Sequence, residues 1–171
     1  MIDQATGESL LVWTIRLSLA CYLARLFVVA RHGWTARIPL KGECVFWTIG
    51  CAFYLVHVAC AFAFAHDWSH ANAIEHTAIE TQRITGVRRG EGLWVNYLFT
   101  LVWFADTARI GIAHHRQRPT NRKTDIAVHA FFGFIFFNAT VVFGPSGYRW
   151  AAVVVVAIYA ALVMQRKVEL Y

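Results

Sequence analysis

Three histidines stand close together in the segment 66–80 of a chain that holds eight of them. His66 and His70 are four residues apart, so on a helix both would project from one face and could share a metal ion. His76 and Glu80 repeat this spacing further along. Imidazole and carboxylate groups are ordinary ligands of transition metals. The sequence therefore predicts a candidate metal site at His66, His70, His76 and Glu80.

The same segment has a second interpretation. His76 lies six residues beyond His70, about 120° around a helix, so one straight helix cannot direct all four side chains at one ion. A site would need a turn, or a ligand from another helix such as Asn96. Alternatively, the segment 67–91 is an interfacial amphipathic helix or loop, because apolar residues recur along one face of it. An H-x-x-x-H pair alone is a weak motif, and both interpretations stay open.

The segment 66–80 lies between the second and third of five apolar stretches, and these stretches determine where it is held. The chain is 58% hydrophobic and only 15% charged, whereas soluble domains carry about 25% charged residues. A helix needs about 20 apolar residues to cross a bilayer, and isolated strands would leave their backbone groups unpaired in lipid. The predicted fold is an all-α polytopic membrane helix bundle with five transmembrane helices in a single domain, 1–171. The predicted spans are 9–30, 44–66, 93–113, 126–144 and 148–164.

Lysine and arginine predict the orientation. Eleven of them flank the first and third linkers and the C-terminus, against four near the second and fourth linkers. Because basic residues near short loops stay on the cytoplasmic side, the N-terminus should be outside and the C-terminus inside. We expect an integral protein of a bacterial inner membrane. The net charge of +6 then suits anionic lipid headgroups, and nucleic acid is not an expected partner.

Polar and ionisable residues inside the spans form a second set of candidates. Each charged one costs about 3 kcal/mol at mid-bilayer, so we expect it to face the bundle. Asp106 and Arg109 are one turn apart, which favours a salt bridge that joins helices. By depth the set forms two layers. The outer polar layer holds Arg16, His57 and Asn138, and the inner polar layer holds Arg25, Asp106, Arg109 and His129.

Haem b is a further candidate cofactor, because small bundles often hold haem between histidines on facing helices. Within the spans the candidate pair is His57 with His129. Their depths differ by about six residues, or roughly 9 Å, so the two helices would have to tilt strongly. Ordinary interhelical hydrogen bonds explain these histidines more simply.

Two functions remain open. The chain lacks a nucleotide-binding glycine loop, a G-x-S-x-G elbow and an H-E-x-x-H motif, which argues against several enzyme classes. We predict a non-catalytic subunit or scaffold of a larger membrane complex, whose partners are other membrane subunits or copies of itself. The alternative is a metal- or haem-binding protein of redox or oxygen chemistry, centred on the histidines of the segment 66–80.

Overall fold

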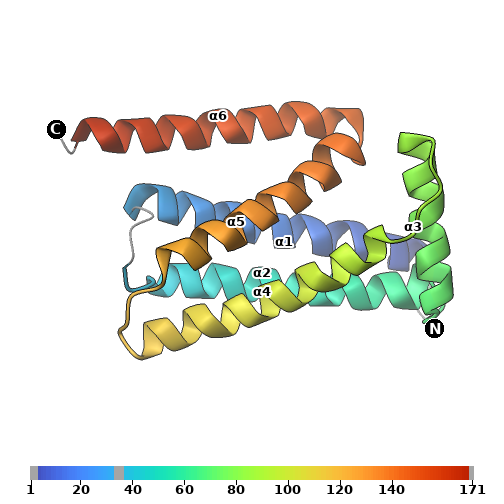
Figure 1. Ribbon diagram of the computed structural model, residues 1–171, viewed down its shortest axis with the longest axis horizontal. Coiled ribbons are helices and arrows are strands. Elements are labelled where there is room, and N and C mark those ends of the chain that lie inside the picture. Colours follow the sequence, from blue (N-terminus) through green and yellow to red (C-terminus); the bar gives the residue numbers. More distant parts are fainter. Residues whose placement is uncertain (1–3, 33–36, 170–171) are drawn as a thin grey trace. The chain divides into compact units, whose positions relative to one another are not determined.

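The chain is helical, as predicted. The computed structural model describes residues 4–32 and 37–169, and these residues contain no strand (Figure 1). Each of the five predicted apolar stretches coincides with a helix, and a further helix lies between the second and third. The elements are α1 (Gln4–His32), α2 (Lys41–Cys60), the π-helical turn η1 (Ala61–Ala65), α3 (His70–Thr85), α4 (Gly92–His115), α5 (Arg122–Phe137), the π-helical turn η2 (Asn138–Val142) and α6 (Ser146–Glu169).

In the part of the chain that the structure describes, three helices are long and apolar enough to cross a membrane. They are α1, α2 continued through η1 to Ala65, and α5 continued through η2 to Val142. In α6 the apolar helix Gly147–Ala161 is shorter. The 24-residue α4 is long enough, but Asn96, Asp106 and Arg109 lower its mean hydropathy. These helices indicate an integral membrane protein.

The packing of the chain divides it into two compact units. Unit 1 comprises residues 1–22 and 47–107, and unit 2 comprises residues 23–46 and 108–171. The long helices α1, α2 and α4 each contribute residues to both units.

Aromatic side chains fill the core of unit 1. Trp47 and Trp103 are fully buried, and their rings lie 5.1 Å apart between centroids. Tyr54 stacks on Trp103 at 5.4 Å and meets the edge of Phe99 at 5.0 Å. Such aromatic pairs add about 0.5–1.5 kcal/mol each beyond the area they bury. This cluster holds α2 against α4.

Helix α1 approaches α2 closely at Gly50. The Ser18 hydroxyl donates to the Gly50 carbonyl over 3.0 Å, and Ser18 is fully buried. A Cβ atom at position 50 would lie only 3.1 Å from both Cys21 and the Trp103 ring. Small residues at helix crossings in membranes allow this close packing. Gly50 therefore sets the α1–α2 contact of unit 1.

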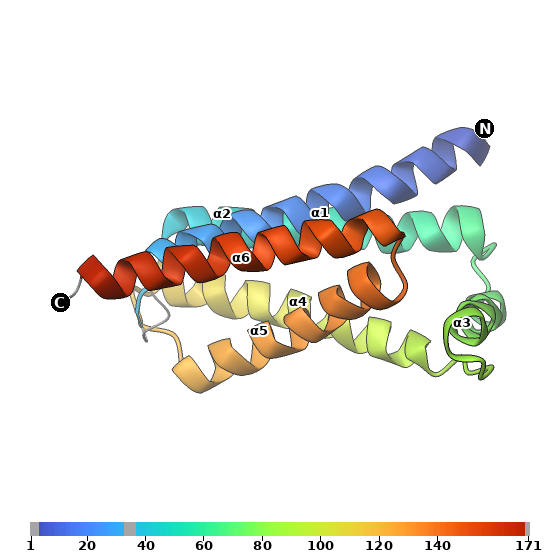
Figure 2. The same ribbon diagram turned by 90° about the horizontal axis from the view of Figure 1, so that it is seen from above.

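In unit 2 the chain reverses after η2, and α6 runs back antiparallel to α5 (Figure 2). Phe132 on α5 is fully buried. The Arg149 guanidinium donates to the Val141 carbonyl over 3.1 Å and joins the start of α6 to η2. Beyond this turn most described side chains of α6 are exposed, including Trp150 and Val156.

Candidate functional site

The predicted metal segment begins at a tight turn between α2 and α3. The Trp68 amide donates to the Phe62 carbonyl and the Ser69 amide to the His66 carbonyl, both over 2.8 Å. Asp67 and Trp68 have φ angles of 48° and 55°, a left-handed conformation that costs roughly 1–2 kcal/mol for each non-glycine residue. After this turn α3 runs across the end of α2 and the start of α4, and it connects these two helices (Figure 1).

Helix α3 occupies the middle of the predicted amphipathic segment 67–91. The Ser69 side chain caps it by accepting from the Asn72 amide over 3.2 Å, and Gly86, with a φ of 77°, ends it. Its buried residues are Ala73 and Ala78. The apolar residues that recur along one face of this segment include Trp68, Ala71 and Ala78; of these three, Ala78 is buried, whereas Trp68 and Ala71 are exposed. The helix is present, but small residues make its packed face.

The structure brings His66 and His76 together. Their ring centroids lie 5.2 Å apart, with the ring planes at 63°. The Nδ1 atom of His66 is buried and has no hydrogen-bond partner among the described residues. Burial and the neighbouring His76 lower the pKa of His66, while the Ala65 backbone and Asp67 act in the opposite direction. A neutral imidazole with an unused nitrogen is a suitable metal ligand, and a proton acceptor as well.

His70 belongs to a different contact. Its Nδ1 atom is hydrogen-bonded to the Tyr97 hydroxyl over 2.9 Å. Its ring stacks on Tyr97 at 5.8 Å and meets the Trp94 ring at 5.5 Å. His70 therefore joins the start of α3 to α4, and its partners are aromatic residues.

The carboxylates of α3 are engaged in ion pairs along its surface. Glu80 accepts from Arg83 over 2.9 Å, and Glu75 pairs with Arg88. Of the four predicted ligands, only His66 and His76 lie together. Among the described residues, no group of three or more His, Cys, Asp or Glu side chains is placed to hold a metal ion.

The predicted outer polar layer lies partly in each unit. In unit 1 the Arg16 guanidinium lies 5.4 Å over the Trp13 ring. The His57 Nδ1–H donates to the Leu11 carbonyl over 3.0 Å and lies 3.5 Å from the Thr14 hydroxyl. In unit 2 the Asn138 amide donates to the Phe134 carbonyl over 2.8 Å. His57 thus joins α2 to α1 through the backbone of α1.

Asp106 and Arg109 of the predicted inner polar layer each bind a residue on another helix. In unit 1 the buried Asp106 carboxylate accepts from the Trp47 indole N–H over 2.9 Å. In unit 2 the Arg109 guanidinium donates to Asp125 over 2.7 Å. Also in unit 2, Arg25 is buried and His129 is half-buried. Both contacts join α4 to another helix, at Trp47 on α2 and at Asp125 on α5.

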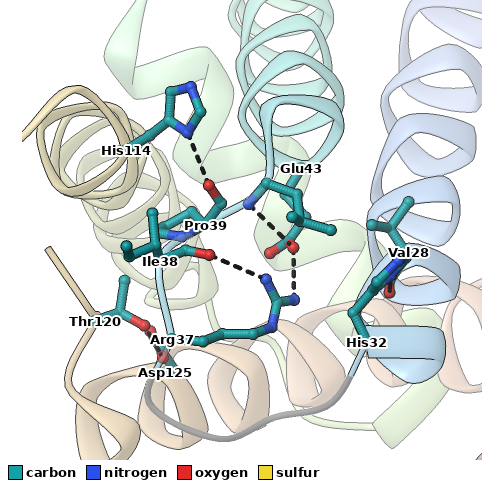
Figure 3. Close-up of polar contacts among 10 residues, drawn as sticks. Val28, His32, Arg37, Ile38, Pro39, Glu43, His114, Thr120 and Asp125 are labelled. Atoms are coloured by element: carbon teal, nitrogen blue, oxygen red, sulfur yellow. Dashed lines mark hydrogen bonds and ion pairs between the residues drawn. The ribbon is translucent and has the colours of Figure 1, made fainter. Parts of the chain in front are cut away.

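The α1–α2 and α4–α5 linkers of unit 2 are joined by hydrogen bonds (Figure 3). The Thr120 amide donates to the Arg37 carbonyl over 3.2 Å. The His114 Nδ1–H donates to the Pro39 carbonyl over 2.7 Å. The Arg37 guanidinium binds the Glu43 carboxylate over 2.5 Å, which fixes the first linker on the start of α2. The two linkers therefore lie at one end of unit 2.

Asp125 is the second acidic residue of this contact. One carboxylate oxygen accepts from Arg109 over 2.7 Å and the other from the Thr120 hydroxyl over 2.6 Å. Its side chain is only 14% exposed, and that of Glu43 is 5% exposed. Charge-assisted hydrogen bonds of this kind are among the strongest in proteins.

Sequence reasoning missed Glu43 and Asp125 as structural residues. The signal that could have found them is their rarity, because each is the lone acidic residue within a strongly basic linker region. A carboxylate in such a place has many cationic partners within reach. Which of these cations the carboxylate binds depends on which helices pack together, and the sequence does not state that packing.

Comparison of the chain with protein-family models, with curated proteins and with solved structures gave no significant match.

Proposed function

We propose that this chain is a non-catalytic subunit or scaffold of a larger complex in a bacterial inner membrane. The observation that supports this most is that several carboxylate and imidazole side chains, which could act in catalysis or metal binding, make structural contacts between helices and linkers. Asp106, Asp125 and His57 each bind a neighbouring helix, and His114 binds a linker carbonyl. Interhelical hydrogen bonds of this kind fix the register of membrane helices.

We further propose five crossings, with the N-terminus outside and the C-terminus inside. The bond between Thr120 and Arg37 supports this, because it joins the linker before α2 to the linker after α4. If α2 crosses the membrane, α4 must cross back for the two linkers to meet. The 24 residues of α4 rise about 36 Å, more than the roughly 30 Å of hydrocarbon.

The partner surface we propose lies on α6. Trp150, Val153 and Val156 are exposed there, and so are the small residues Ala157 and Ala161. An exposed apolar surface suits lipid, but small residues four apart also allow another helix to approach closely. Another membrane subunit or a second copy of the chain would pack on this face.

Photo-cross-linking tests the subunit proposal. A photoreactive phenylalanine analogue at position 161 of the full chain, in native membranes, should cross-link one polypeptide that is retained at fixed stoichiometry in mild detergent. Ala157→Phe should abolish this cross-link because it fills the small-residue face. Ile158→Phe, which places the same aromatic side chain at an exposed neighbour that is already large, should preserve it. A chain that is monomeric by native mass spectrometry and cross-links only lipid would contradict the proposal.

Cysteine labelling tests the orientation. Single cysteines at Asn72 and His115, which are both exposed, would be introduced after replacement of the four natural cysteines by alanine. An impermeant maleimide should reach position 72 from outside the cell and position 115 only after lysis. Labelling of both from the same side would overturn the topology.

A second candidate function, binding of a transition metal, rests on the contact between His66 and His76. Two imidazoles at this separation could hold an ion whose other ligands are water. Elemental analysis of the purified full chain should then find stoichiometric metal that is lost with His66→Ala and His76→Ala. His70→Ala, which alters the Tyr97 contact, is the control. Absence of stoichiometric metal, together with a visible spectrum free of haem bands, would eliminate this candidate.

A further inference from the structure

The two linkers of unit 2 expose basic side chains without exposed acidic ones. Among the described residues of these linkers and the adjoining helix ends, the only carboxylates are Glu43 and Asp125. Both are largely buried and bound to arginine. The exposed cations, which we call the basic linker surface, are Arg31, Lys41, Arg116, Arg118, Arg122 and Lys123.

Membrane insertion alone does not account for this arrangement. Orientation during insertion requires only that basic residues be present near the ends of the spans. It does not require that the neighbouring carboxylates be withdrawn from the surface. Because Glu43 and Asp125 are bound to Arg37 and Arg109, the described parts of the two linkers and the adjoining helix ends offer the exposed cations no unpaired carboxylate.

The hydrogen bonds between the linkers give this surface a fixed form. Thr120 and His114 bind the backbone of the first linker at Arg37 and Pro39 (Figure 3). Asn121 caps α5 by accepting from the Lys123 amide over 2.9 Å. Hydrogen bonds therefore fix the backbone that carries these cations. Because less backbone has to become ordered, less entropy is lost when a ligand binds.

Exposed apolar side chains border the same cations. The Arg31 guanidinium lies 4.9 Å over the Phe27 ring, and Ile38, Leu40 and Ile126 are exposed next to the basic positions. A surface that presents cations beside apolar groups matches the boundary between phosphate groups and acyl chains. A soluble acidic protein or a nucleic acid would cover the cations but leave these apolar groups in water.

We propose that the basic linker surface binds the phosphate groups of anionic phospholipids in the adjoining leaflet. This inference rests on the membrane setting of the chain and not on its role as a subunit. The full chain in neutral detergent would be titrated with phosphatidylglycerol and with phosphatidylcholine of the same acyl chains, and bound lipid measured by native mass spectrometry. We expect at least tenfold tighter binding of phosphatidylglycerol.

Matched triple variants locate the effect. Arg118→Gln, Arg122→Gln and Lys123→Gln together should reduce the preference for phosphatidylglycerol at least tenfold, since each basic residue near an anionic surface contributes about fivefold. Arg83→Gln, Arg88→Gln and Arg89→Gln together remove the same charge near α3 and should leave the preference unchanged. Thermal unfolding would verify that both variants fold.

Four results would overturn the inference. One is equal affinity for the two lipids, and another is an equal loss in both triple variants. Full displacement of phosphatidylglycerol by inorganic phosphate at the same concentration would assign the surface to free phosphate. If the first triple variant instead releases an acidic polypeptide and keeps its lipid preference, the surface is a protein contact. A monomeric chain that prefers phosphatidylglycerol would contradict the subunit proposal alone.

Discussion

The α3 segment of unit 1 and the basic linker surface of unit 2 differ in where their carboxylates lie. On α3 the pairs Glu80–Arg83 and Glu75–Arg88 have side chains 41–60% exposed, and such pairs contribute about 0–1 kcal/mol. Beside the linkers, the Glu43 and Asp125 side chains are 5% and 14% exposed, and those of their partners Arg37 and Arg109 are 22% and 28% exposed. Breaking a buried pair costs roughly 3–5 kcal/mol. Similar residue types therefore stabilise one region far more than the other.

The largest expected effect is that of Glu43→Ala. It removes the partner of Arg37 and an acceptor of the Leu40 amide, and we expect unfolding in detergent to become easier by about 3 kcal/mol. Glu43→Gln retains an acceptor for the amide and should lose less. Denaturant titration followed by circular dichroism would measure both. Equal stability of Glu43→Ala and the natural chain would show that the ion pairs beside the linkers stabilise the chain no more than those on α3.

Asp125→Ala should have the next largest effect, about 2 kcal/mol, because the Arg109 and Asp125 side chains are less deeply buried than Glu43. Thr120→Val removes one of the two hydrogen bonds to this carboxylate and should cost about 1 kcal/mol. A double-mutant cycle between positions 120 and 125 measures their coupling. Zero coupling would show that the Thr120 hydroxyl does not stabilise the linker contact.

The helices could be predicted from the sequence, whereas the partners of most polar residues could not. Hydropathy reports on each helix separately, so the five apolar stretches were found, although within residues 4–32 and 37–169 three helices meet the length and hydropathy of a span. The spacing of Asp106 and Arg109 predicted a salt bridge that joins helices, but it could not name the partner of Arg109. The structure gives it Asp125 as a partner on α5, and sequence periodicity contains no information about which helix packs beside α4.

The metal prediction depended on a continuous helix through His66 and His70. The helix ends at Ala65 and restarts at His70, after two residues in the left-handed conformation. His66 and His70 therefore face different neighbours, and His66 meets His76 instead. No sequence rule anticipates consecutive left-handed residues at Asp67 and Trp68, since neither is glycine.

Acidification should destabilise the packing of α3, by less than the substitutions Glu43→Ala and Asp125→Ala destabilise the chain. The pKa of His66 lies below its ordinary 6.5, because burial and His76 disfavour the charged form. The neutral form is thus favoured in the folded state, so the packing of α3 is most stable above about pH 6.5 and weakens as the pH falls towards the folded pKa. Hydrogen exchange of α3 amides, corrected for intrinsic rates, should speed up between pH 7.5 and 5.

His66→Gln is the control for this pH dependence, because it removes the titrating group at similar size. His76→Gln removes one of the two causes of the lowered pKa and should reduce the dependence without abolishing it. Asp67 is the charged group that opposes the shift, so Asp67→Asn should enlarge it. Exchange rates that do not change with pH in the natural chain would show that the His66–His76 contact leaves α3 stability unaffected.

Glu75→Gln should have the smallest effect on the free energy of unfolding, below about 0.5 kcal/mol, because both partners of its pair with Arg88 are more than half exposed.

High salt should separate the exposed ion pairs of α3 from the less exposed pair of Glu43. At 1 M NaCl the Debye length falls to about 3 Å, so Glu75→Gln and Glu80→Gln should become indistinguishable from the natural chain, whereas Glu43→Ala should retain most of its loss. A loss at Glu75 comparable to that at Glu43 would mean that a partner covers α3 in the membrane, because only burial can give an exposed pair the energy of a buried one.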